Sequence, residues 1–149
     1  RQVFFVSIGG FDTHGGQNVA HANLMARLSH ALGYFDAQLG ALGVRDQVTL
    51  FTASDFGRTF VSNGDGTDHG WGAHHFVMGA AVRGREIYGR FPELGDSDDA
   101  VGRSGSWIPV QAVDQVGATL GRWFGAGAGE LDLVFPNLRH FGQRDLGFV

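Results

Sequence analysis

Aspartate and histidine residues gather in two glycine-rich segments of this chain, and these residue types bind divalent metals. The first segment holds Asp12 and His14 and directly follows the apolar run at residues 3–8. In extended backbone, side chains two residues apart point into one crevice. Loops that follow buried strands hold the ligands of many α/β proteins. Asp12 and His14 therefore indicate a metal site, with a turn or helix-cap role for Asp12 as the alternative.

The second segment adds a carboxylate and a cation. Asp55 follows the apolar run at residues 48–52 in the way that Asp12 follows the first run. Two neighbouring carboxylates repel each other unless a cation joins them, so the pair strengthens the metal interpretation. Arg58 has two interpretations, a structural ion pair or a fork that binds an anionic ligand.

Histidine completes the candidate ligand set. His69 lies in a glycine-flanked loop beside Asp68, where an imidazole would fill a metal shell and a carboxylate would orient it. Partly buried contacts or helix faces are the favoured places for the other histidines, which are His21, His30, His74, His75 and His140. Acidic turns at Asp96, Asp98, Asp99 and in residues 63–66 hint at calcium, but they lack the EF-hand pattern.

Composition excludes several classes of function. The chain has 149 residues, a net charge of −4 and no cluster of basic residues, which argues against nucleic acid as the main partner. No apolar run approaches the roughly 20 residues that span a bilayer, so no membrane span is expected. Cysteine is absent, which excludes disulfides and thiolate metal ligands. The 25 glycines follow no period and fit tight turns.

The elements that would position these residues begin with a strand, a helix and a strand. Apolar side chains recur every three or four positions over residues 18–42, which predicts an amphipathic helix ended by Gly43. The apolar runs at residues 3–8 and 48–52 predict strands on either side of it. A right-handed crossover between parallel strands is the default for this order. Both candidate loops would then emerge at one edge of a sheet.

The second half of the chain is less regular. A further strand is predicted at residues 76–82 and a second helix at 111–124. The rest is predicted to be irregular: residues 60–80 are loop-rich, residues 93–106 form a polar excursion, and residues 131–149 form a tail. These elements predict an α/β fold with a mainly parallel sheet flanked by helices. The abrupt start at a strand-like run predicts that the chain is a fragment of a larger domain.

Several uncommon strings, in order, resemble the bacterial "domain of unknown function 1501" proteins. They are Gly-Gly-Phe-Asp-Thr-His (9–14), Ser-Asp-Phe-Gly-Arg-Thr (54–59), Ser-Asn-Gly-Asp-Gly-Thr-Asp-His-Gly-Trp-Gly (62–72), the run at 79–92 and Phe-Pro-Asn-Leu (135–138). The resemblance covers nearly the whole chain. It implies that residues 1–149 are the C-terminal part of one alkaline phosphatase-like α/β domain, in a superfamily that also contains the sulfatases.

The resemblance also implies a ligand set. Asp12 is similar to the superfamily's first-metal aspartate, His14 would take the place of a nearby histidine, and His69 is similar to the late histidine that closes this site. Asp55 is similar to the aspartate of the superfamily's Asp-His-Gly element, but Phe56 stands where that histidine would be. This departure puts a second metal in doubt. The nucleophile would lie outside this chain.

The predicted function is that of a metal-dependent hydrolase of phosphate or sulfate esters. The ligands of a divalent metal ion would be Asp12, His14, Asp55 and His69, with zinc or manganese the favoured metal and calcium an alternative. Arg58 would be the catalytic residue that stabilises the anionic substrate, and Arg58 and Asn63 would bind that substrate. Expected partners are a small anionic ester, the missing N-terminal part of the protein and, through exposed sheet edges, a second copy. Resemblance places the protein in the periplasm or outside the cell. The alternative is a non-catalytic binding or structural protein of the cell envelope; a calcium-stabilised surface protein carries little weight.

Overall fold

The computed structural model describes residues 1–92, 100–101 and 105–149, which divide into two compact units. The larger unit comprises residues 2–80 and 92–109, and the smaller comprises Arg1, residues 81–91 and residues 110–149. Asp96, Asp98 and Asp99, the candidate calcium ligands, lie outside the described residues, as does most of the predicted excursion at 93–106.

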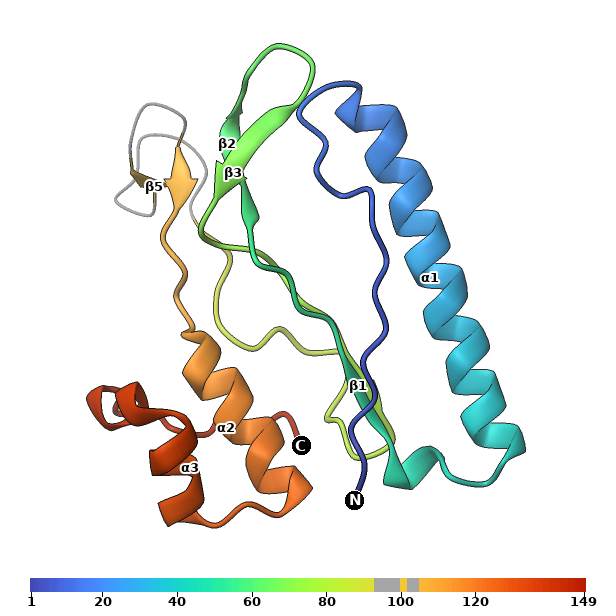
Figure 1. Ribbon diagram of the computed structural model, residues 1–149, viewed down its shortest axis with the longest axis vertical. Coiled ribbons are helices and arrows are strands. Elements are labelled where there is room, and N and C mark those ends of the chain that lie inside the picture. Colours follow the sequence, from blue (N-terminus) through green and yellow to red (C-terminus); the bar gives the residue numbers. More distant parts are fainter. Residues whose placement is uncertain (93–99, 102–104) are drawn as a thin grey trace. The chain divides into compact units, whose positions relative to one another are not determined.

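The larger unit contains one long helix and all of the strands that the described residues form (Figure 1). Its elements are α1 (Gln17–Ala41), the 3-10 turn η1 (Arg45–Gln47), β1 (Thr49–Phe51), β2 (Gly57–Ser62), β3 (Thr67–Gly70), β4 (Val77–Gly79), β5 (Ala100–Val101) and β6 (Ser106–Trp107).

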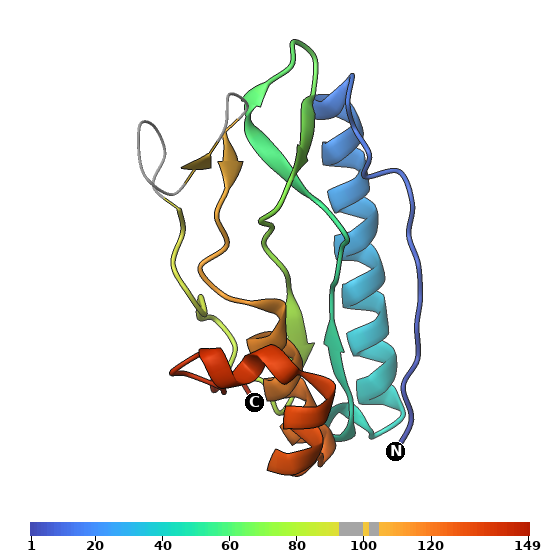
Figure 2. The same ribbon diagram turned by 60° about the vertical axis from the view of Figure 1, so that its left-hand side comes forward.

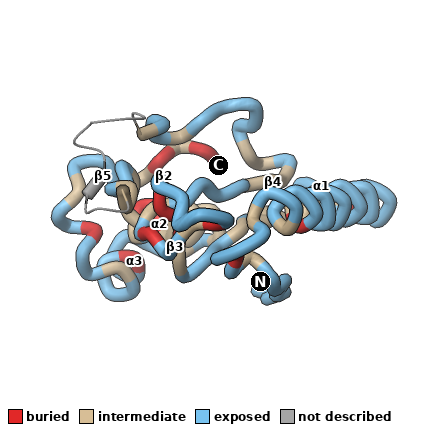
Figure 3. The backbone as a smooth tube through the Cα atoms, turned by 90° about the horizontal axis from the view of Figure 1, so that it is seen from above, coloured by how far each residue is buried: buried red, intermediate tan, exposed pale blue. Residues whose placement is uncertain are grey.

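Helix α1 confirms the helix predicted at residues 18–42. It ends at the C-cap Leu42, and Gly43 follows with a φ of 69°, a left-handed conformation that glycine adopts without steric cost. Only Leu24 and Leu39 of this helix are buried, and most of the helix is exposed along its length (Figure 3). Periodicity thus predicted the helix correctly, although little of its apolar stripe is covered.

The predicted parallel sheet is wrong. The described strands form three two-stranded antiparallel sheets, β1 with β4, β2 with β3, and β5 with β6. Residues 3–8 are extended but make no strand pairing, and Phe4 and Phe5 are 81% and 91% exposed. Strand β1 pairs with β4 in antiparallel register, Phe51 opposite Val77. A run of residues joins a sheet only by pairing its backbone with a neighbouring strand, and here the first apolar run pairs with no strand among the described residues.

A β-hairpin replaces part of the loop predicted at residues 60–80. Strands β2 and β3 pair with Arg58 opposite His69 and Ser62 opposite Thr67, with an irregularity in register between the two pairs. At the turn, the Asn63 amide N–H donates to the Gly66 carbonyl at 3.0 Å. In Figures 1 and 2 this hairpin reaches the loop that precedes α1.

The smaller unit is helical, with α2 (Val113–Phe124), α3 (Ala128–Val134) and the 3-10 turn η2 (Pro136–His140). Helix α2 confirms the helix predicted at 111–124, whereas α3 occupies the start of the tail predicted to be irregular. Ala118 of α2, Leu131 of α3 and Leu138 of η2 form its buried apolar cluster. Among the helices of the described residues, none is long and apolar enough to cross a membrane.

Candidate metal centre

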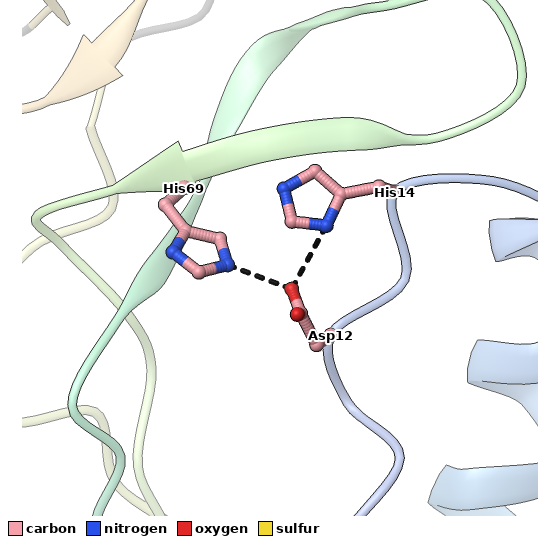
Figure 4. A group of neighbouring side chains, drawn as sticks. All are labelled: Asp12, His14 and His69. Carbon is pink, nitrogen blue, oxygen red and sulfur yellow. Dashed lines mark hydrogen bonds and ion pairs between the residues drawn. The ribbon is translucent and has the colours of Figure 1, made fainter.

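Asp12, His14 and His69 converge on one point at the surface of the larger unit (Figure 4). The Asp12 Oδ1 atom lies 2.9 Å from His14 Nδ1 and 2.7 Å from His69 Nε2. One ligand atom from each of the three residues falls within 4.8 Å of the others. Within the described part of the chain, no other group of three histidine or carboxylate side chains gathers in this way. The cluster contains three of the four predicted metal ligands.

The electrostatic surroundings keep Asp12 ionised. The hydrogen bond from His69 lowers the pKa of the Asp12 carboxyl below its usual value, and desolvation opposes this effect. The nearby charges of His14, His69 and Arg58 lower the pKa further. An ionised carboxylate between two imidazoles is a donor set that divalent transition metals accept.

Two segments of the chain supply the cluster. Asp12 and His14 lie in the loop before α1, two residues apart as the sequence indicated. His69 belongs to β3 and lies directly opposite Arg58 of β2. Residues in opposite positions of an antiparallel pair project from the same face of the hairpin. The hairpin therefore places His69 and Arg58 together where they face Asp12.

Asn63 fastens the hairpin turn to the loop that carries the ligands. Its side-chain Nδ2 donates to the His14 carbonyl at 3.2 Å and to Asp68 Oδ1 at 3.0 Å. Its Oδ1 accepts the Gly66 amide N–H at 3.0 Å. Both ends of the Asn63 amide are thus engaged within the protein. The predicted contact of Asn63 with substrate stays a prediction.

Asp65 and Gly66 make the rest of this junction. The Gly16 amide N–H donates to Asp65 Oδ2 at 2.8 Å, and the Gln17 amide N–H donates to the Asp65 carbonyl at 3.0 Å. These are the N-cap and first helical amides of α1, so Asp65 satisfies two of the N–H groups that a helix start leaves without an intrahelical partner. Gly66 packs so closely on the His14 backbone that a Cβ atom there would lie 2.5 Å from the His14 carbonyl.

Arg58 is held inside the larger unit. One of its terminal nitrogens donates to the Thr67 carbonyl at 2.8 Å, and the other donates to the Phe11 carbonyl at 2.6 Å and to Asp12 Oδ1 at 3.2 Å. Its side chain is 18% exposed, and its buried Nε has no hydrogen-bond partner. Of the two sequence interpretations, the structural ion pair is present. The predicted catalytic contact with an anionic substrate stays a prediction.

Asp55 does not join the cluster. It is exposed, and the structure gives it no hydrogen bond or ion pair with any described residue. The expected pairing of Asp12 with Asp55 depended on parallel strands ending at one edge, and the antiparallel pairing removes that edge. The sequence-based prediction that Asp55 is a metal ligand is untested, and the metal site proposed below consists of the other three ligands alone.

Phe56 contacts the cluster in a way that the sequence did not reveal. Its ring stacks on the His69 imidazole, with centroids 4.0 Å apart and planes inclined by 3°. The Arg58 guanidinium carbon lies 5.1 Å from the centroid of the same ring. In the sequence, Phe56 stands out only as the position where the superfamily's histidine is missing. The spacing of Phe56 and Arg58 could have indicated that Phe56 lies beside the cluster, because residues two apart in extended backbone face the same side.

The fold and this cluster define a protein with a surface group of one carboxylate and two imidazoles, which the loop before α1 and the β2–β3 hairpin bring together. The chain belongs to the family described as "Protein of unknown function (DUF1501)", which it matches over residues 1–105. That match confirms the predicted family and includes every residue of the cluster. The link to the phosphatase and sulfatase superfamily stays a prediction. No curated protein and no solved structure matches this chain.

Proposed function

We propose that this protein is a metal-dependent hydrolase of phosphate or sulfate esters, in which Asp12, His14 and His69 hold one divalent cation. The observation that supports the proposal is the convergence of the three ligand atoms within 4.8 Å. The ester class comes from the family resemblance. The expected location in the periplasm or outside the cell stays a prediction.

The donor set fits zinc or manganese. Two imidazole nitrogens and one carboxylate oxygen form a common set for catalytic zinc, whereas calcium takes six to eight oxygen ligands. Three protein ligands leave coordination positions for water or substrate. The side chains of Asp12, His14 and His69 are 61%, 48% and 47% exposed, so a small ester reaches them from solvent.

The residues of the chain have distinct tasks in this proposal. Asp12 supplies the negative charge that offsets part of the cation's charge, and His14 and His69 supply neutral nitrogen donors. Arg58 holds Asp12 through its ion pair at 3.2 Å. When bound, a divalent cation polarises the ester oxygens and lowers the pKa of a bound water.

A second candidate is a non-catalytic binding or structural protein of the cell envelope. The engagement of Arg58 favours this candidate, because two backbone carbonyls and Asp12 occupy the guanidinium that was expected to bind an anion. This candidate predicts a stably folded protein that holds no metal and hydrolyses no ester, so metal content and ester hydrolysis both distinguish the two candidates.

Metal analysis of the chain purified without chelator, beside Asp12→Asn and Asp55→Asn, tests the ligand set. We expect one equivalent of zinc or manganese in the wild type, loss of metal in Asp12→Asn, and retention in Asp55→Asn because Asp55 lies outside the cluster. Hydrolysis of p-nitrophenyl phosphate or p-nitrophenyl sulfate by the longest natural form would support the enzyme. Bound metal without hydrolysis of either ester would establish the site but count against the hydrolase. A folded wild type that takes up no added metal would refute the metal site and favour the non-catalytic protein.

A further inference from the structure

His69 differs from most metal-binding histidines in what orients its ring. A ligating histidine usually donates its second ring nitrogen to a carboxylate or a carbonyl, which fixes the ring plane. Among the described residues, His69 forms one hydrogen bond, from Nε2 to Asp12, and its Nδ1 has no partner. Another contact must therefore hold the plane of this imidazole if Nε2 is to face a cation.

Phe56 provides that contact. The two rings are 4.0 Å apart and nearly parallel, inclined by 3°. Such stacking restricts rotation of the imidazole about its bond to Cβ, because tilting the ring would drive its edge into the phenyl face. The ring of Phe56 is itself in contact with the Arg58 guanidinium, at 5.1 Å.

Four side chains, each in contact with the next, form a closed ring of contacts, called the circuit below. Arg58 pairs with Asp12, Asp12 accepts from His69, His69 stacks on Phe56, and Phe56 contacts Arg58. Two backbone carbonyls fix the guanidinium, at 2.8 Å and 2.6 Å, so the circuit is tied to the main chain. The cross-strand register of Arg58 and His69 connects it to the hairpin as well.

We propose that Phe56 and Arg58 are positioning residues that hold the His69 ring and Asp12 Oδ1 in place, so that a cation that displaces the Nε2 proton to solvent binds Nε2 and Oδ1 together. The inference rests on the proposed metal site and names the residues that hold its ligands in place. In a site for one cation, Phe56 would thus orient the imidazole of His69, whereas the family resemblance marked it only as a lost ligand. Loss of outer partners lowers metal affinity on the order of 10- to 100-fold, and we expect an effect at the lower end for a stacking contact.

The test uses the 149-residue chain with Phe56→Leu, Phe56→Tyr and Phe60→Leu. Phe60 is the matched control, since it lies on β2 and contacts Trp107, at 5.1 Å between ring centroids, rather than the cluster. Zinc affinity is measured by calorimetry, and the coordination geometry is followed in the absorption spectrum of the Co²⁺-loaded chain. We expect Phe56→Leu to bind zinc about tenfold more weakly with an altered cobalt spectrum. Phe56→Tyr should restore both, and Phe60→Leu should match the wild type.

A measurement without metal checks the stack itself. The ring protons of His69 should resonate upfield in the wild type because they lie over the Phe56 ring. This shift should fall in Phe56→Leu to what the His14 ring, with its centroid 4.9 Å from that of His69, contributes. Should Phe56→Leu not fold, Arg58→Lys replaces it: lysine keeps the charge but lacks the planar fork, so weaker zinc binding is expected.

The outcomes separate the inference from the proposed function. A wild type that binds no zinc overturns the metal site and the positioning role together. A wild type that binds zinc, with unchanged affinity and cobalt spectrum in Phe56→Leu (or in Arg58→Lys, if that variant is needed), overturns the positioning role alone and leaves the metal site standing.

Discussion

Replacing Gly66 by alanine tests how the metal cluster is assembled. The new Cβ would lie 2.5 Å from the carbonyl carbon and oxygen of His14 and 2.6 Å from the Thr13 carbonyl oxygen. Real Cβ atoms essentially never approach other atoms closer than 3.0 Å. All three obstructing atoms belong to the backbone, so no side chain can rotate away. The hairpin turn must therefore move from the loop that carries Asp12 and His14.

The cost follows from what the movement disrupts. Three hydrogen bonds join the turn to this loop, Asn63 Nδ2 to the His14 carbonyl and the Gly16 and Gln17 amides to Asp65. At about 0.5–1.5 kcal/mol each, their complete loss would amount to about 1.5–4.5 kcal/mol. Retaining them under strain would cost about 1–3 kcal/mol, as overpacking does. Either way we expect the free energy of unfolding of the larger unit to fall by about 2–4 kcal/mol.

Urea denaturation of the metal-free chain, followed by circular dichroism, measures this loss, and calorimetry with zinc measures the effect on the site. Gly15→Ala is the matched control, because its Cβ would meet only Asp65 Oδ2, at an ordinary 3.9 Å. We expect Gly15→Ala to stay within about 0.5 kcal/mol of the wild type. A Gly66→Ala protein with the denaturation midpoint, slope and zinc affinity of the wild type would refute the proposed junction.

Two further predictions concern other parts of the chain. Desolvation of the imidazole, with a smaller contribution from neighbouring His74, lowers the pKa of His75 from 6.5, so the folded state binds this proton less readily than the unfolded state. Stability should therefore fall as the pH drops through 6.5 towards the lower folded pKa, and the decline should be smaller in His75→Gln; equal declines in thermal scans from pH 7.5 to 5 would contradict this. Leu138→Ala should cost about 2–4 kcal/mol in the smaller unit, because it removes a side chain only 2% exposed that packs on Ala118 and Leu131; an unchanged melting temperature would be inconsistent with that cluster.

Local sequence patterns determined the helices and the types of residue at the site. Helices α1 and α2 were predictable because their apolar residues recur with helical spacing, which depends only on near neighbours in sequence. The short runs that form β1 and β4 were also recognised, although both are shorter than predicted. Asp12, His14 and His69 stood out because their residue types bind metals and lie among glycines.

Only the tertiary structure decided which strands pair and which candidate residues meet. Asp12 and His69 are 57 residues apart, and no local pattern reports a hydrogen bond over that separation. Antiparallel pairing of β1 with β4 left Asp55 outside the cluster, and the β2–β3 register brought Arg58 to Asp12. The direction of strand pairing depends on which distant backbone groups satisfy one another, whereas composition and periodicity record only what each segment can form alone.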